Sequence, residues 1–374
     1  MRHISCTDNI FVMNRFASTL ILSLGLFLLH PLPSAKACTG ITLTTRDKQV
    51  VVARTIEWGG SDLQSHYVIV PRGYVQESWL PGSTGGGLRF TARYGYVGFA
   101  VNQKEFVTEG LNEKGLSAGL FYFPQYGKYP EYDATQRQHT ISDLQLVPWI
   151  LGSCATVDEV RGALKTVRVS SVDPRASTVH WRFTDSTGKQ IVLEFEDGVP
   201  HFYDNPLGVL TNSPGLPWQL TNLNNYAHLI PGPVAEQQFG DHTLRSFGMG
   251  TGMWGLPGDV TPPSRFVRAF FYQTTAPTPA TTADAVRSAF QILHNFDLPI
   301  GIEVSKDTEA PNIPSATQWT SATDIANLCI YYTTMYNPAI RGFDLRTINF
   351  ATTKYRAVPL DPPTPVPFQM LTVK

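Results

Sequence analysis

The stretch Ala35-Lys36-Ala37-Cys38-Thr39-Gly40 joins two parts of the chain that differ sharply in composition. Before it, residues 20–29 form an apolar run, with Arg15 on the N-terminal side and prolines following. A basic flank, a short apolar core and small residues before the cut are the features of a secretory signal peptide. The run is shorter than the roughly 20 apolar residues that span a bilayer. We therefore expect residues 1–37 to be removed and Cys38 to begin the mature chain.

An N-terminal cysteine carries a thiol and a free α-amine on one residue, a potential nucleophile beside a potential base. Two other interpretations stay open at this point. Cys38 can be an ordinary cysteine that follows the cut, or it can carry a lipid anchor, although Ala35 at −3 is not aliphatic and Lys36 stands at −2. The start codon is open between Met1 and Met13.

Composition indicates a globular exported protein. Removal of the first 37 of 374 residues leaves enough chain for one large domain or two ordinary ones. Hydrophobic residues make up 42% and aromatic residues 11%, so a substantial core is expected. The 29 basic and 30 acidic side chains nearly balance, which indicates neither nucleic acid nor an anionic membrane as partner. With no later run apolar enough to span a membrane, we expect a periplasmic or secreted protein.

Three of the four cysteines, Cys38, Cys154 and Cys329, belong to the expected mature chain. An odd number in an exported protein indicates at least one free thiol. Either Cys154 and Cys329 pair and leave Cys38 free, or all three stay unpaired. We favour the second arrangement, because free cysteine packs as a small hydrophobe. There is no CxxC motif and no metal-ligand spacing among the histidines, so we expect neither metal nor cofactor.

The segment after Cys38 has the pattern of a β-hairpin. Residues 39–44 alternate, a polar break follows, and residues 50–56 are a β-branched run. In an antiparallel hairpin Cys38 then falls opposite residue 56 or 57, beside Arg54 and Glu57. An arginine and a glutamate that end an apolar strand face either a site or, if the strand emerges there, solvent.

Other segments predict a mixed architecture. Strand patterns are expected at residues 66–71, 88–101, 106–108, 116–123, 179–183, 191–195, 208–211, 325–336 and up to residue 350. Helical patterns are expected at residues 144–151, from the capping box at Thr156, and at 217–227, 266–272 and 282–295. The glycine-rich residues 82–87 are expected to form a loop between two strands, and the tail from Pro359 is proline-rich. Hairpins at both ends with helices between them predict α+β layers around antiparallel sheets.

Two motif matches fail their structural context. Gly115-Leu-Ser-Ala-Gly119 fits the G-x-S-x-G nucleophile elbow, which needs a strand before it and a helix after it. Here a turn precedes the motif and a strand follows, so Ser117 is not expected to be the nucleophile. Gly250-Thr-Gly-Met-Trp-Gly255 fits G-x-G-x-x-G, but a proline and a glycine come next and no helix can begin there.

Several short blocks, taken together and in order, resemble one known family. They are a Cys38-Thr-Gly start, Ala53-Arg-x-x-Glu-Trp58, Leu111-Asn-Glu-Lys-Gly-Leu116, Leu210-Thr-Asn-Ser-Pro214, Gly255-Leu-Pro-Gly-Asp259 and Ser264-Arg-Phe266. This set resembles the choloylglycine hydrolase family of bile salt hydrolases and penicillin V acylases, over about residues 38–350. The resemblance implies an N-terminal-nucleophile hydrolase of linear amides. It also implies one domain over residues 38–374, folded as a four-layer αββα sandwich of two antiparallel sheets, and a homo-oligomer, a tetramer.

The same resemblance implies roles for particular residues. Carried over by position, the nucleophile is Cys38, the arginine beside the thiol is Arg54, the oxyanion-side asparagine is Asn212 and the second active-site arginine is Arg265. Both arginines would favour the thiolate. The α-amine of Cys38 can exchange a proton with the thiol and later with the leaving amine.

Two positions depart from the bile salt hydrolase pattern. Glu57 stands where those enzymes have Asp, and its extra methylene moves the carboxylate that would hold the α-amine. Tyr122 stands where they have Asn and resembles the penicillin V acylases as a substrate-binding residue, although ordinary strand packing also accounts for it. We expect a small-molecule amide substrate, penicillin V before conjugated bile salts, with acyl-homoserine lactones as a third class. A non-catalytic exported binding protein or lipoprotein is the alternative of another kind.

Overall fold

The computed structural model describes residues 36–59, 61–173, 177–303 and 316–373. The chain divides after Ser34 into two units, and all described residues belong to the second, Ala35–Lys374. The predicted signal peptide lies almost wholly outside the described residues, as does Cys6. In the described part of the chain, no helix is long and apolar enough to cross a membrane.

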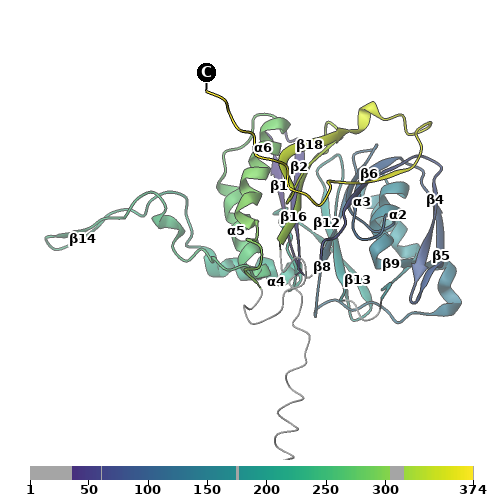
Figure 1. Ribbon diagram of the computed structural model, residues 1–374. Coiled ribbons are helices and arrows are strands. Elements are labelled where there is room, and N and C mark those ends of the chain that lie inside the picture. Colours follow the sequence, from purple (N-terminus) through teal and green to yellow (C-terminus); the bar gives the residue numbers. More distant parts are fainter. Residues whose placement is uncertain (1–35, 60, 174–176, 304–315, 374) are drawn as a thin grey trace, which may run out of the picture. The chain divides into compact units, whose positions relative to one another are not determined.

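The first sheet joins strands from the early and the late part of the chain (Figure 1), and Cys38 lies on its edge strand. It has five antiparallel strands, in the order β1 (Lys36–Thr44), β2 (Val50–Trp58), β16 (Ala316–Asp324), β17 (Cys329–Thr334) and β18 (Asn337–Asp344). The predicted hairpin is confirmed, and its register pairs Cys38 with Ile56 and Gly40 with Arg54. Cys38 and Arg54 therefore project from the same face of the sheet, because side chains alternate along a strand.

The second sheet is larger. It has eight strands, in the order β13 (Val199–Asp204), β12 (Gln190–Glu196), β11 (Val179–Thr184), β8 (Ser117–Tyr122), β7 (Val107–Asn112), β6 (Tyr96–Ala100), β3 (His66–Val70) and β19 (Arg356–Pro359). Three two-stranded sheets accompany it: β4 (Val75–Leu80) with β5 (Ser83–Thr91), β9 (Thr140–Ser142) with β10 (Arg168–Ser170), and β14 (Gln237–Phe239) with β15 (His242–Leu244). The two large sheets lie face to face, with β1 against β8 and β17 against β7.

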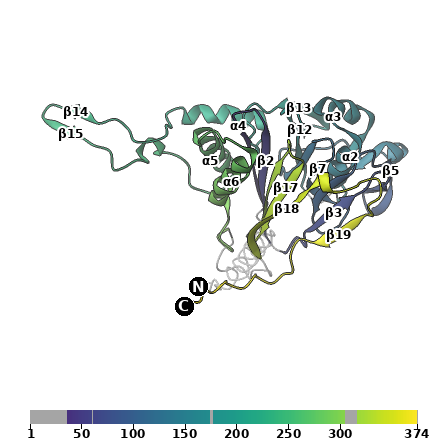
Figure 2. The ribbon, with the colours of Figure 1, turned by 90° about the horizontal axis from the view of Figure 1, so that it is seen from above.

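Helices cover the outer faces of both large sheets, which confirms the predicted four-layer αββα sandwich (Figures 1 and 2). Helices α5 (Pro262–Thr275) and α6 (Thr282–Leu293) lie on the first sheet, whereas α2 (Leu146–Ser153) and α3 (Val157–Ala163) lie beside the second. The short helix α4 (Leu216–Asn222) precedes α5. Short 3-10 helices are η2 (Ala134–His139), η3 (Asp143–Gln145), η4 (Leu164–Thr166), η5 (Leu223–Tyr226), η6 (Thr251–Met253), η7 (His294–Phe296) and η8 (Leu345–Thr347).

The helix ends have the chemistry expected of them. Thr156 caps α3 by accepting a hydrogen bond from the Glu159 backbone, as its capping box predicts. Thr281 and Asp284 form a reciprocal capping box on α6. Helix α5 begins with two prolines in its first turn, where a missing N–H leaves no intrahelical hydrogen bond unmade. This start places Arg265 in the second turn, on the side of β1.

Some sequence expectations were wrong. Of the glycine-rich residues 82–87, only Gly82 lies in a turn, and residues 83–87 begin strand β5, where a Cβ on Gly87 would lie 2.8 Å from the Ser78 carbonyl oxygen. Glycine is needed there for close approach of the backbones. Strands β4, β16 and β19 were not expected, and residues 208–211 form only an isolated bridge between Leu210 and Gly40. All three described cysteines are buried and unpaired, as favoured.

Candidate active site

Cys38 lies near the start of β1, with its thiol between the two large sheets. The side chain is 4% exposed. On the same face, Arg54 of β2 donates a hydrogen bond from Nη2 to Cys38 Sγ over 2.7 Å. The pattern of an apolar strand that ends in charge therefore marks a buried site rather than a strand emerging into solvent, since Arg54 is fully buried.

The guanidinium of Arg54 is fixed by contacts on every side. Nε donates to the Thr55 carbonyl oxygen at 3.1 Å, and Nη1 donates across the sheets to the carbonyl oxygens of Leu120 and Thr108. Its plane lies over the Phe121 ring, 4.1 Å from the centroid. A guanidinium with so many partners presents Nη2 to the sulfur in one orientation.

Asn212 and Arg265 hold the main chain of Cys38 rather than its thiol. The Asn212 Oδ1 atom accepts a hydrogen bond from the Cys38 backbone nitrogen at 2.9 Å and another from Arg265 Nη2 at 2.6 Å. Arg265 Nη1 donates to the Cys38 carbonyl oxygen and, at 2.9 Å, to Thr39 Oγ1. The segment before Asn212 is joined to β1 by two backbone hydrogen bonds between Gly40 and Leu210. The residues that the sequence places far apart thus meet at one point.

These contacts also decide how the Asn212 amide is oriented. Because Oδ1 accepts from two N–H donors, Nδ2 must face the Tyr122 carbonyl oxygen, to which it donates at 2.7 Å. An amide nitrogen has two hydrogens. One is used by Tyr122, so the second can donate to an oxygen that arrives beside Cys38.

Burial outweighs the arginines in setting the acidity of the thiol. Burial raises the pKa of the Cys38 thiol above its ordinary value, and Arg54 is the strongest influence in the opposite direction. Glu57 raises the pKa further, whereas a backbone hydrogen bond from Tyr122 and the charge of Arg265 lower it. Both arginines act as expected, but in the chain that retains residues 36 and 37 they do not make the thiol acidic.

Glu57 lies on the opposite face of β2 from Arg54. Its register partner is Ala37, the residue before Cys38. Among the described residues, Thr317 Oγ1 approaches Oε1 at 3.4 Å, whereas Oε2 is buried without a hydrogen-bond partner. Burial raises the pKa of Glu57 to about 7, with Arg265 as the main opposing influence. The carboxylate thus lies opposite Ala37, and its Oε2 atom has no hydrogen-bond donor within the described residues.

Tyr122 ends strand β8 and joins the site through its backbone. Its carbonyl oxygen accepts from Asn212, and its ring is half-buried. The structure brings Cys38, Arg54, Asn212 and Arg265 into direct hydrogen-bond contact and places Glu57 beside them. It connects Tyr122 through the main chain.

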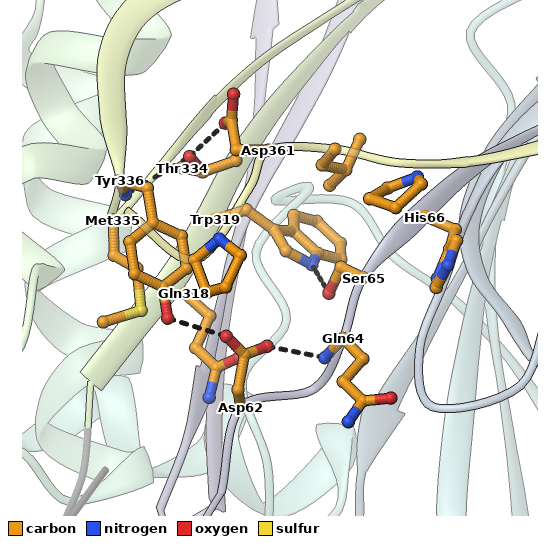
Figure 3. Close-up of a pocket in the computed structure, with 13 residues that line it drawn as sticks. Asp62, Gln64, Ser65, His66, Gln318, Trp319, Thr334, Met335, Tyr336 and Asp361 are labelled. Atoms are coloured by element: carbon orange, nitrogen blue, oxygen red, sulfur yellow. Dashed lines mark hydrogen bonds between the residues drawn. The ribbon is translucent and has the colours of Figure 1, made fainter. Parts of the chain in front are cut away.

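A cavity of about 330 Å³ lies between the start of β3, the start of β16, the end of β17 and the C-terminal segment (Figure 3). Its walls include Asp62, His66 and Trp319, and Tyr336 donates to Asp62 across it at 2.7 Å. The Trp319 indole also lies 5.5 Å from the Arg54 guanidinium. Cys38 and Asn212 are not among the described residues that line the cavity.

Sequence reasoning missed two buried charges near the thiol. Glu109 of β7 and Arg182 of β11 are each 1% exposed and face Arg54 from the second sheet. A signal was present, because each is a charged residue inside an otherwise apolar strand. In the described part of the chain, no group of three or more His, Cys, Asp and Glu side chains is arranged to hold a metal ion.

The comparison with protein families decides what this arrangement is. A model of the linear amide C-N hydrolases of the choloylglycine hydrolase family matches residues 38–357. The chain belongs to this family. As a choloylglycine hydrolase family member it is an enzyme that acts on linear amide C–N bonds, and the match begins at Cys38 itself.

Named family members resemble the chain over most of its length. It is 32% identical to the bile salt hydrolase/transferase of Clostridium perfringens over 83% of this chain and 93% of that protein. It is 30% identical to the penicillin V acylase of Pectobacterium atrosepticum over 83% of this chain and 81% of that protein. A crystal structure of a variant of the conjugated bile acid hydrolase from Clostridium perfringens superposes with a TM-score of 0.76 at 27% identity, covering 90% of this chain and 100% of that one.

Proposed function

We propose that Cys38 becomes the N-terminal residue after residues 1–37 are removed, and that its thiol is the nucleophile that cleaves the amide. The observation that carries the proposal is the hydrogen bond from Arg54 Nη2 to Cys38 Sγ, 2.7 Å long and fully buried. The family match that begins at Cys38 supports the position of the cut. The remaining contacts then acquire chemical roles.

The first step needs a base, and the α-amine of Cys38 supplies it. In the unprocessed chain the Cys38 nitrogen is an amide that donates to Asn212, and an amide nitrogen cannot accept a proton. Removal of Ala37 converts it into an amine with a reference pKa of about 8. The amine takes the thiol proton, and Arg54 stabilises the thiolate that attacks the substrate carbonyl.

The second step needs donors for the oxyanion. The Asn212 side chain is held in one orientation, because Oδ1 and one Nδ2 hydrogen are already bonded, and the second Nδ2 hydrogen has no partner among the described residues. A donor that is fixed in advance stabilises developing charge without reorganisation, and one such contact is worth roughly 3 kcal/mol. The C–N bond breaks, the α-ammonium protonates the leaving amine, and a thioester remains on Cys38. Water then attacks the thioester and releases the acid.

A comparison of variants tests the nucleophile. Cys38→Ser, Cys154→Ser and Cys329→Ser are assayed for amide hydrolysis, with circular dichroism to confirm that each folds. Only the first should lose turnover, because Arg54 donates to the Cys38 thiol, whereas the other two buried thiols belong to the end of α2 and the start of β17. Full turnover in Cys38→Ser would exclude Cys38 as the nucleophile.

We propose penicillin V as the preferred substrate, with conjugated bile salts second. The support is Tyr122, where the bile salt hydrolase pattern has Asn, and where an aromatic ring suits a phenoxyacetyl group. The second candidate is favoured by the likeness to proteins named as bile salt hydrolases. Measuring kcat/KM on penicillin V, a glycine- or taurine-conjugated bile salt and an acyl-homoserine lactone side by side ranks the three classes.

We further propose export and self-assembly. The predicted signal peptide supports export to the periplasm or medium, and the N-terminal sequence of the protein recovered from each cell fraction tests it.

Assembly is supported by an arm, residues 228–258, which carries β14 and β15 away from α5 (Figures 1 and 2). Phe247, Met249 and Trp254 on this arm are 95%, 74% and 72% exposed. Light scattering of the wild type against a Phe247→Ser/Met249→Ser variant should show a tetramer that the variant loses.

A further inference from the structure

Three charged side chains are buried together between the two large sheets. They are Arg54 of β2, Glu109 of β7 and Arg182 of β11, each at most 1% exposed. One Glu109 oxygen lies 3.7 Å from Arg54 Nη1, and the other lies 3.8 Å from Arg182 Nη2. We call these three residues the charge array. It begins at the thiol, because Arg54 is bonded to Cys38 Sγ.

Each arginine of the array crosses from its own sheet to the other. Arg54 donates to carbonyl oxygens of β7 and β8, whereas Arg182 donates to the carbonyl oxygens of Ile41 at 3.3 Å and Ala53 at 3.4 Å. Both guanidiniums lie over the ring of Phe121, 4.1 and 5.4 Å from its centroid. The two cations are therefore held near one another, with the single carboxylate of Glu109 between them.

The backbone makes room for the array at two glycines. Gly119 pairs with Glu109 on one side and Arg182 on the other, and a Cβ on Gly119 would lie 2.4 Å from Glu109 Oε2. A Cβ on Gly40 would lie 2.8 Å from Arg182 Nη1. Glycine inside a strand weakens it. The glycines of Cys38-Thr-Gly40 and of Gly115-Leu-Ser-Ala-Gly119 are thus explained by the space that these charges need.

Glu109 interacts with the two arginines by charge attraction and not through hydrogen bonds. At 3.7 and 3.8 Å both exceed hydrogen-bond length, and Glu109 Oε2 and Arg182 Nη2 have no hydrogen-bond partner within the described residues. Buried ion pairs often fail to recover their desolvation cost. Stability alone therefore does not account for the array.

The net charge of the array favours the thiolate form of Cys38. Burial raises the pKa of Glu109, and the charges of Arg182 and Arg54 oppose that rise. With Glu109 ionised, two guanidiniums and one carboxylate leave a surplus of one positive charge, and the thiolate of Cys38 is the group bonded to the array that can balance it. We propose that Glu109 and Arg182 are positioning residues for the reaction, which set the charge around Arg54 and thereby the fraction of Cys38 present as thiolate. This inference rests on the proposed role of Cys38 as nucleophile.

Other charged groups also influence the thiol electrostatically and must stay unchanged in the test. Arg54 and Glu57 belong to β2, and Arg265 belongs to α5. Glu109 itself faces Arg54, Arg182 and the Ser117 hydroxyl. Substitutions at Glu109 and Arg182 alter the charge behind Arg54 while leaving those nearer groups in place.

The test measures the rate at which iodoacetamide alkylates Cys38 in the processed enzyme as a function of pH, with the modified peptide identified by mass spectrometry. Below the pH at which half of the Cys38 thiol is ionised, the alkylation rate is proportional to the fraction of Cys38 present as thiolate. Glu109→Gln should raise the rate at about pH 6 by roughly threefold to tenfold, and Arg182→Gln should lower it by a similar factor. Arg346→Gln, at an exposed arginine, is the control and should leave the profile unchanged.

The decisive result is that the two single variants shift the pH profile of Cys38 alkylation in opposite directions. If Glu109 and Arg182 had only a structural role, their substitution would weaken folding but would not shift this profile in opposite directions. Shifts of one sign, or no shift in folded variants, overturn the proposal. If one of the single variants does not fold, the double variant Glu109→Gln/Arg182→Gln decides the question. It removes one negative and one positive charge together, so it should fold, and the midpoint of its alkylation pH profile should equal that of the wild type. A double variant that is unfolded or displaced overturns the proposal as well.

Alkylation reports on the thiol and not on turnover, so the two proposals fail separately. If Cys38 is not the nucleophile, Cys38→Ser retains amide hydrolysis whatever the array does to the pH profile. If Cys38 is the nucleophile but the array is irrelevant, Cys38→Ser is inactive and the profiles of Glu109→Gln and Arg182→Gln coincide with that of the wild type.

Discussion

Glu57 lies directly across the β1–β2 pair from Ala37, the residue before Cys38. Its Oε2 atom is buried without a hydrogen-bond partner in the described part of the chain. If Ala37 is removed as we propose, the new α-ammonium of Cys38 lies next to this register position, where it can donate to Oε2. Glu substitutes for the Asp of the bile salt hydrolase pattern, and its location fits a partner for the processed terminus.

In the unprocessed chain, Glu57 should reduce stability at high pH. Burial raises its pKa to about 7, against an ordinary value near 4.5, so the folded chain keeps the proton to higher pH than the unfolded chain. The favourable contribution is present below about pH 4.5 and is lost as pH rises through about 7. Glu57→Gln should therefore raise the free energy of unfolding by roughly 1–3 kcal/mol at pH 8 and leave it unchanged at pH 4. Urea unfolding of both chains at the two pH values measures this, and a difference that does not depend on pH would contradict it.

A chain that retains Ala37 should fold but not turn over substrate. Its β1 already includes residues 36 and 37, so the fold tolerates them. The Cys38 nitrogen is then an amide and cannot act as the base. We expect the chain that retains Ala37 and the chain that begins at Cys38 to give the same circular dichroism spectrum, and only the second to turn over substrate. Equal turnover in both would show that the amine is not needed.

Cys38→Ser should fold and lose turnover by on the order of a thousandfold or more, because a hydroxyl is far harder to ionise than a thiol. Iodoacetamide should inactivate the wild type, and a serine-directed fluorophosphonate should not. The reverse pattern would return attention to Ser117, which is buried at 2% exposure on β8.

Tyr122→Asn should shift preference from penicillin V toward conjugated bile salts. An aromatic contact with a phenoxyacetyl group is worth about 0.5–1.5 kcal/mol. The ratio of the two kcat/KM values should change by roughly tenfold for each 1.4 kcal/mol of altered transition-state binding. Equal losses on both substrates would mean that Tyr122 acts through the backbone carbonyl that holds Asn212, and would leave the substrate preference without support.

The local part of the fold could be predicted and the long-range part could not. The hairpin that pairs Cys38 with Ile56 follows from alternation and a short turn, and it placed Arg54 beside the thiol. Strand β16 is rich in Thr and Ser, and its burial comes from its central place between β2 and β17 rather than from its own pattern.

The site itself shows the same division. Asn212 and Arg265 were expected through family resemblance, because nothing in their spacing from Cys38 predicts a meeting across 174 and 227 residues. Glu109 and Arg182 come together because β7, β8 and β11 are neighbours in the second sheet. Strand order is decided by the packing of the whole domain, so no local pattern contains it.

The most direct test of the central claim is peptide mapping by mass spectrometry of the enzyme quenched with acid during turnover of penicillin V. The N-terminal peptide should begin at Cys38 and carry a phenoxyacetyl group on its sulfur as a thioester, and the Cys38→Ser protein should carry none. An acyl group on another residue, or turnover by a protein whose N-terminal peptide begins before Cys38, would contradict the account.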